Sequence, residues 1–133
     1  MDRLIETFTD EQRKAIFSIV FDCMIVDGQE PSKAREEYLN AVCTVIEMDQ
    51  NLRNEVYKER ITYDENALTV SVLPARERAR LAIFMYQMFK LNQTPITPKQ
   101  ITYFRIIDSI ASLRSALEET GLINWKSGIR ELF

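Results

Sequence analysis

The sequence predicts an all-α fold, with six or seven helices packed into one compact bundle. Apolar residues recur at helical spacing along most of the chain, and helix-capping residues stand where these patterns begin. A chain of 133 residues with 46% apolar residues can bury a core as one domain, and no linker rich in Pro or Gly divides it. We therefore expect residues 1–133 to form a single domain.

Two helices are predicted in the first third of the chain. Thr9 and Gln12 form a capping box for the first helix, and Gly28 can end it in a left-handed conformation. Ser32 then caps the second helix. The expected buried faces are Ile16, Ile19, Val20, Cys23 and Met24 in the first helix, and Leu39, Val42, Cys43 and Ile46 in the second.

Asp49 is expected to start a third helix over about residues 51–60, and the segment that follows can be interpreted in two ways. Asp64 as a cap, with Leu68 and Val72 at helical spacing, favours a short helix. The stretch TVSV taken alone is also typical of a strand. Pro74 then suits the first turn of a long helix, because that position needs no N–H donor. The apolar face of the long helix consists of Leu81, Phe84, Met85, Met88 and Phe89.

A second capping box begins the last long helix, with Thr97 as the cap, Pro98 at the first helical position and Gln100 at the third. We expect this helix to end before Gly121. Its buried face is expected to be Tyr103, Ile106, Ile107, Ile110 and Leu113, and the tail is expected to dock through Trp125 and Phe133.

The second half of the sequence repeats the pattern of the first without a gap, at the offset that takes position 16 to position 81. The apolar face of the first helix falls on that of the long helix. Further matched pairs are Ser32 with Thr97, Tyr38 with Tyr103, Leu39 with Phe104 and Val42 with Ile107. We predict two pseudo-symmetric helix-loop-helix repeats, over roughly residues 9–50 and 74–118, whose apolar faces cover each other. The alternative is chance similarity between amphipathic helices.

The amino-acid composition argues against several classes of function. The chain has no histidine, which removes the usual general base of a Ser or Cys nucleophile and the commonest zinc ligand. Cys23 and Cys43 lie in apolar helical patterns and are expected to be buried thiols. No run is apolar enough for a membrane span or a signal core, and no basic patch with interleaved aromatics indicates nucleic-acid binding. A cytoplasmic protein is expected.

Charge is divided unevenly along the chain. Residues 1–65 carry 8 Lys or Arg against 15 Asp or Glu, and residues 66–133 carry 9 against 5, so the halves have net charges of −7 and +4. An acidic first half attracts cations or basic partners. Opposite charges on the two halves also permit association of two copies of the chain.

The candidate site residues are Asp27, Glu30, Glu36 and Glu37. An anion at the end of a helix opposes the helix dipole, so Asp27 either caps the turn or binds a cation or partner. The three glutamates lie in the loop and at the start of the next helix, where acids also stabilise the helix. Together the four residues can offer oxygen ligands to calcium or magnesium. Tyr38 at the last ligand position excludes an EF-hand.

The sequence MIVDG at residues 24–28, followed by an acidic helix start, resembles the TerB-like domain family, named for tellurite-resistance proteins. The same domain type is found in some membrane-anchored J-domain co-chaperones. The resemblance covers about residues 10–118. It implies an all-helical fold of about seven helices in a duplicated unit, with an Asp-Gly loop in each half.

Matched residue by residue, Asp27 and Gly28 correspond to the family's loop. The glutamate that usually follows about seven positions later is replaced by Ala34, with Glu36 and Glu37 the nearest acids. In the second half Asn92 and Gln93 replace Asp-Gly, and the later position is Lys99. The chain therefore departs from the paired acidic metal site suggested for family members.

The sequence predicts a noncatalytic binding or scaffold module. The resemblance implies a role in stress response or protein assembly, with a protein partner or a second copy bound at the acidic surface. The first alternative is a domain that binds a divalent cation through the Asp27 loop. The second is a small metal-dependent hydrolase that uses paired carboxylates. No other cofactor is indicated.

Overall fold

The computed structural model describes residues 8–91, 95–124 and 127–133. This part of the chain is helical and contains no strand, so the all-α prediction is confirmed. Its α-helices are α1 Asp10–Ile25, α2 Lys33–Val45, α3 Gln50–Lys58, α4 Tyr63–Ser71, α5 Ala75–Lys90, α6 Pro98–Ala111 and α7 Leu113–Thr120. Two 3₁₀ helices follow, η2 Leu122–Asn124 and η3 Ser127–Leu132.

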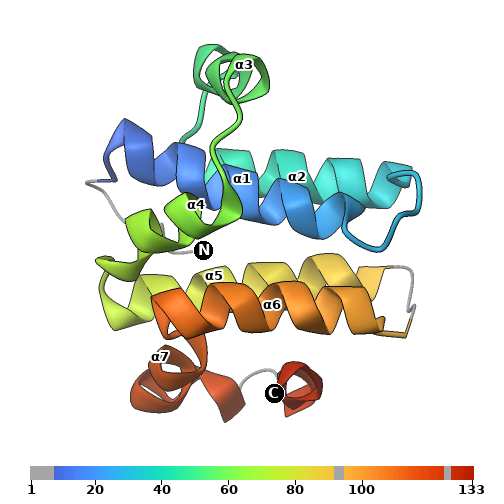
Figure 1. Cartoon of the computed structure of the whole chain (residues 1–133), viewed down its shortest axis with the longest axis vertical. Helices are drawn as coiled ribbons and strands as arrows, with labels where there is room; N and C mark the ends of the chain where they lie inside the picture. The colour runs from blue at the N-terminus through green and yellow to red at the C-terminus, as the bar shows by residue number, and fades with distance from the viewer. Residues whose placement is uncertain (1–7, 92–94, 125–126) are drawn as a thin grey trace.

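The helices form two stacked pairs. α1 lies beside α2, α5 lies beside α6, and α1 packs on α5 to join the pairs (Figure 1). α4 packs against both α1 and α6, and so crosses from one pair to the other. α3 lies at one end of the long axis, whereas α7 and η3 lie at the other (Figure 1). Within the described residues, no helix has the length and apolarity that a membrane crossing requires.

The predicted apolar faces of α1 and α5 form the centre of the core. All five expected residues of α1 are buried, and so are Leu81, Met85, Met88 and Phe89 of α5, whereas Phe84 is half-buried. Phe17, Phe89 and Phe104 are 0% exposed. Burying one such side chain contributes about 1.5–3 kcal/mol, so these faces supply much of the driving force for folding. Both cysteines are buried free thiols, as predicted.

The helix interpretation of residues 63–71 is confirmed, but the predicted buried face of α4 is wrong. Ala67 and Val70 are buried, whereas Leu68 is 60% exposed and Val72 is 76% exposed. Thr62, and not Asp64, occupies the N-cap position. The helix carries two apolar stripes, and the one with the small Ala67 faces inward where α4 lies against α1 and α6. Spacing alone does not distinguish the two stripes.

The predicted single helix after Thr97 is interrupted at Ser112, which has a left-handed φ of 55°. The side chain of Asp108 accepts a hydrogen bond from the Arg114 backbone N–H at 2.7 Å and so stabilises the start of α7. No Gly or Pro marks this break in the sequence, which is why it was not predicted. Gly28 has the expected left-handed conformation, with φ of 81°. The Trp125 prediction lies outside the described residues.

Pro74, predicted to lie in the first turn of this helix, is the N-cap residue of α5, immediately before the first helical residue Ala75. In the capping boxes of α1 and α6, a glutamine at the third helical position accepts a hydrogen bond from the N-cap backbone N–H. Glu77 holds the same position in α5, but Pro74 has no N–H to donate. Glu77 is buried, and its Oε2 has no hydrogen-bond partner among the described residues. Burial raises the pKa of Glu77, against the opposing charges of Arg80 and Arg76.

One arginine fastens the chain around α1. Arg13 donates from Nη1 to the carbonyl of Phe8 at 2.6 Å and from Nε to the carbonyl of Ile46 at 2.9 Å. It thereby joins the segment before α1 to the end of α2.

A second arginine fastens the chain around α5 in the same way. Arg78 donates from Nε to the carbonyl of Leu73 at 2.9 Å and from Nη1 to the carbonyl of Ala111 at 3.0 Å. It joins the segment before α5 to the end of α6. Hydrogen bonds from charged donors are among the stronger ones in proteins. Each arginine therefore stabilises a carbonyl at the end of one helix, which has no acceptor role within that helix, and a carbonyl in the segment before another helix.

We expect Arg13→Ala and Arg78→Ala each to lower the free energy of unfolding by about 1–3 kcal/mol, because each leaves part-buried carbonyls without a donor. Chemical denaturation measures the change. Arg105→Ala on the exposed side of α6 is the control, and we expect it to change stability by less than about 0.5 kcal/mol. Equal effects of all three substitutions would contradict the fastening role.

Candidate functional site

Asp27 is held by a buried ion pair with Arg35. Nη2 of Arg35 lies 2.9 Å from Oδ2 of Asp27, and Nη1 lies 3.2 Å from Oδ1. The Arg35 and Asp27 side chains are only 6% and 7% exposed. Nη1 also donates to the carbonyl of Met24 at 3.0 Å. The fork geometry satisfies both carboxylate oxygens and binds the end of α1 to the start of α2.

Two further donors approach the Asp27 carboxylate. The backbone N–H of Gln29 donates to Oδ1 at 3.1 Å, which is the predicted turn role of this residue. Nε2 of Gln100, a buried residue of α6, lies 3.5 Å from Oδ2. Burial acts to raise the pKa of Asp27, but the hydrogen bonds from Arg35 and Gln29 and the Arg35 charge bring it below its ordinary value. The carboxylate therefore stays ionised as a junction between α1, α2 and α6.

The structure does not gather the other predicted site residues around Asp27. Glu30, Glu36 and Glu37 are exposed, and Glu37 lies 3.9 Å from the ammonium of Lys33 on the same helix. Within the described ranges, no three Cys, Asp or Glu side chains lie close enough together to hold a metal ion. The four predicted ligands thus divide into one buried, paired aspartate and three separate surface acids.

Arg35 is the residue that sequence reasoning missed. It lies at the third position of α2, where a positive charge opposes the helix dipole. A basic residue in an unfavourable place, eight positions after an equally unfavourable Asp27, was the available signal. Two charges that each oppose a helix dipole cancel that cost when they pair.

Two tyrosines connect the helix pairs. The Tyr103 hydroxyl of α6 donates to Oδ2 of Asp22 in α1 at 2.8 Å, and the Tyr38 hydroxyl of α2 donates to Oε1 of Gln87 in α5 at 2.5 Å. Burial raises the pKa of both tyrosines. Burial also raises the pKa of Asp22, although Tyr103 and Arg60 act to lower it. The two tyrosines therefore keep their protons, Asp22 keeps its hydrogen-bond partners, and both contacts support the packing of one helix pair on the other.

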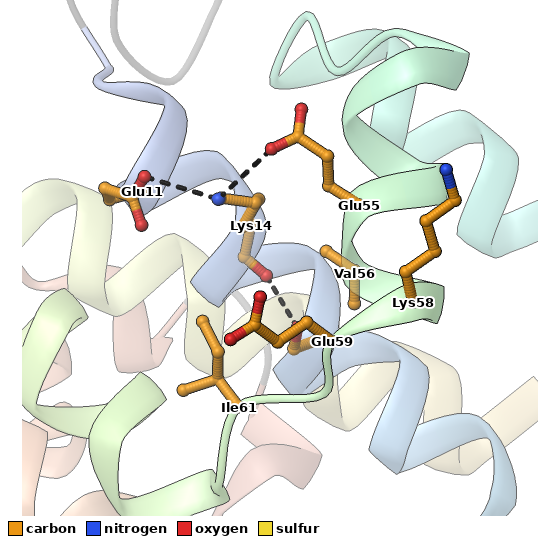
Figure 2. A pocket seen from close by; sticks show the side chains of 8 residues that line it. Glu11, Lys14, Glu55, Val56, Lys58, Glu59 and Ile61 are labelled. Atoms are coloured by element: carbon orange, nitrogen blue, oxygen red, sulfur yellow. Dashed lines mark hydrogen bonds and ion pairs between the residues drawn. The ribbon is translucent and has the colours of Figure 1, made fainter.

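A charged cleft of about 360 Å³ lies between α1 and α3 (Figure 2). Nζ of Lys14 lies 3.3 Å from Glu11 and 3.6 Å from Glu55, and Figure 2 shows it pointing between these two carboxylates. Glu59, Val56 and Ile61 form another part of the lining. Partial burial acts to lower the pKa of Lys14, but the two glutamates together raise it above its ordinary value.

The protonation states at these places are unsuited to nucleophilic chemistry. A lysine acts as a nucleophile when its pKa is depressed, and here the pKa of Lys14 is raised. A cysteine acts as a thiolate, but burial raises the pKa of Cys23 well above its ordinary value and the residue is 0% exposed. The arrangement can bind and fasten, and none of these groups is activated for catalysis.

The comparisons add no relative to this description. A scan against protein-family models found no match, and no match was found among curated proteins or among solved structures. The functional interpretation therefore depends on the geometry of the chain's own residues.

We expect Asp27→Asn to lower the free energy of unfolding by about 3 kcal/mol at neutral pH, because it leaves the buried Arg35 charge without its partner. Folding lowers the pKa of Asp27, so the pair's contribution is complete above the ordinary aspartate pKa and is lost as the pH falls below about 4. Denaturation between pH 7 and 2 should therefore show a smaller loss for Asp27→Asn than for the parent. The double variant with Arg35→Met completes the cycle and should recover part of the stability.

Proposed function

We propose that this chain is a noncatalytic binding or scaffold module, similar to the TerB-like domains and built from two pseudo-equivalent repeats at residues 9–50 and 74–118. It presents an acidic surface to a basic protein partner. The observation that carries the proposal is the Asp27–Arg35 pair, because it commits the one buried acid of the loop to structure and leaves exposed glutamates as the loop's binding groups.

Helix bounds and arginine contacts support the duplication. α1 and α5 begin at Asp10 and Ala75, and α2 and α6 begin at Lys33 and Pro98, so the offset between the first residues is the same in both pairs. The arginine contacts repeat at this offset too. It takes the two carbonyls bonded by Arg13 onto the two carbonyls bonded by Arg78.

Two other features recur at the same offset. The offset takes Tyr38 to Tyr103 and Asp22 to Gln87. In each of the two hydrogen bonds, a tyrosine hydroxyl of one half therefore donates to a side chain of the other half. The non-glycine residues with left-handed φ in the described chain, Glu47 and Ser112, are also related by it. Chance similarity of amphipathic helices accounts for apolar faces but not for matched polar contacts and backbone conformations.

The acidic surface lies on the loop and on the outer side of α2. Glu30 and Glu36 are exposed, and Glu37 pairs only across the surface with Lys33. Surface ion pairs of this kind contribute little to stability, so these acids are available to a partner at little cost. Partner binding by such a surface is driven by charge and weakens as salt is added.

A peptide made only of lysine, about ten residues long, tests the surface. We expect it to bind the full chain at low salt and to lose at least about tenfold in affinity when Glu30, Glu36 and Glu37 are changed to Lys. The control is Glu119→Lys, a change at an exposed residue of α7, which should leave the affinity within about twofold; a single Glu36→Lys variant matches its charge change. Calorimetry at two salt concentrations measures both. An unchanged affinity of the lysine peptide for the triple variant would overturn the proposal.

The alternative function is divalent-cation binding at the same loop, which the exposed side chains of Glu30 and Glu36, close to Asp27 in the sequence, would support. A cation must compete with Arg35 for Asp27, so we expect binding no tighter than the millimolar range seen in weak calcium sites. NMR titration with calcium, magnesium, manganese and zinc, repeated on Asp27→Asn, decides. Saturable shifts that vanish in the variant would favour the cation site over the protein partner.

A further inference from the structure

A groove of about 290 Å³ lies between α1, α2 and α3. Its floor is apolar, with Met24 and Leu39 buried and Phe21 half-buried. Tyr57 of α3 forms one wall and is 46% exposed. The groove is also lined by Glu36, Asn40 and Arg53. This volume lies just below the roughly 300–1,000 Å³ of typical ligand pockets, so it suits one or two apolar side chains.

The corresponding place in the second half is filled by the chain itself. The offset between the repeats takes Phe21 to Tyr86 and Leu39 to Phe104. The η3 segment lies there: the Tyr86 hydroxyl donates to Glu131 at 2.9 Å, and the ring of Phe133 lies 6.2 Å from that of Phe104.

The η3 segment anchors itself through apolar side chains. Ile129 and Leu132 are 0% exposed, and Phe133 is half-buried and lies under the Arg114 guanidinium at 4.7 Å. These three residues follow the spacing of one helical face, with Glu131 between them as the polar contact. Residues 129–133 therefore show, in the second half, what kind of segment such a groove can bind.

No described segment fills the groove of the first half in this way. Figure 1 shows α3 at its end of the molecule without a counterpart of η3 beside it. Tyr57 is among the exposed large apolar side chains of the described chain. Aromatic residues at the wall of a partly apolar groove are typical of binding surfaces.

Arg53 defines the polar preference of the groove, because it is the guanidinium group among the lining residues, whereas Arg60 is paired with Asp22 at 2.8 Å. Arg53 lies over the Phe17 ring at 5.2 Å and Arg60 over the Phe21 ring at 5.0 Å. Arg53 donates to Asn40 and Tyr57, but its buried Nε has no hydrogen-bond partner among the described residues. Glu36 lies among the lining residues contributed by α2. A bound carboxylate is therefore favoured toward the α3 side and disfavoured beside Glu36.

We propose that this groove binds a short amphipathic segment of a partner protein, with apolar residues at the spacing of Ile129, Leu132 and Phe133 and one carboxylate directed toward Arg53. The inference depends on the duplication proposed above but not on the acidic surface. It assigns the first half an occupant from another protein, of the kind that the second half takes from its own chain.

The probe is the peptide SGIRELF, which copies residues 127–133, titrated into the full chain and followed by NMR. Saturable shifts in α1, α2 and α3 are expected, with a peptide carrying Ile129→Ser and Leu132→Ser binding at least about tenfold more weakly. Tyr57→Ala should weaken binding about tenfold, whereas Tyr63→Ala should leave it within about twofold. Tyr63 is a matched control because it is 47% exposed on α4, away from the groove.

Tyr57→Glu provides a second variant, and we expect it to weaken binding further by opposing the peptide carboxylate. Circular dichroism checks that each variant is folded. The proposal is overturned by an absence of saturable shifts, by shifts confined to α5 and α6 around Phe104, or by equal effects of the Tyr57 and Tyr63 variants. A variant with only Glu30 and Glu37 changed to Lys separates the two proposals, since it weakens binding of the lysine peptide and leaves every residue that lines the groove, Glu36 included, in place.

Discussion

The buried pair of Asp27 and Arg35 is the constraint on which the first half of the molecule depends. It joins the end of α1 to the start of α2 through a bidentate contact, and Gln100 extends the junction to α6. Arg35 and Gln100 each hold the third position of their helix. One carboxylate thereby contacts the third residue of both α2 and α6, and its oxygens are already occupied by these donors. Asp27, a candidate site residue in the sequence, therefore has a structural role at the junction of α1, α2 and α6.

Sequence reasoning predicted the features that depend on local chemistry. The capping boxes at Thr9 and Thr97 and the apolar faces of α1 and α5 follow from periodicity and cap preference, which act within a few residues. The features it missed depend on distant contacts. Ser112 breaks a helix without Gly or Pro, and the inward stripe of α4 is chosen by its neighbours α1 and α6. Arg35 was not predicted for the same reason, because its partners come from other elements.

The pKa shifts of Asp27, Lys14 and Cys23 all favour the unreactive form of each group. Catalysis requires groups whose pKa values are moved toward neutrality and whose reactive atoms reach a substrate. Here Asp27 is shifted further into its charged form, Lys14 further into its protonated form, and the thiol of Cys23 is kept neutral by burial. What remains at the surface is charge on one side of the first half and an apolar groove at its end. Glu36 belongs to both features, since it is exposed on α2 and also lines the groove.

The buried glutamate at the start of α5 has a consequence for how the fold responds to acid. The pKa of Glu77 is raised from the ordinary glutamate value, whereas the pKa of Asp27 is lowered, so Glu77 takes up its proton first as the pH falls. Protonation removes a buried charge to which Pro74 can donate no hydrogen bond, and this favours the folded state. As the pH falls, protonation of Glu77 therefore stabilises the start of α5 first. Protonation of Asp27 then weakens the contact between α1 and α2 at lower pH. Glu77 and Asp27 thus contribute to stability with opposite dependence on pH, since protonation of Glu77 favours the folded state and protonation of Asp27 opposes it.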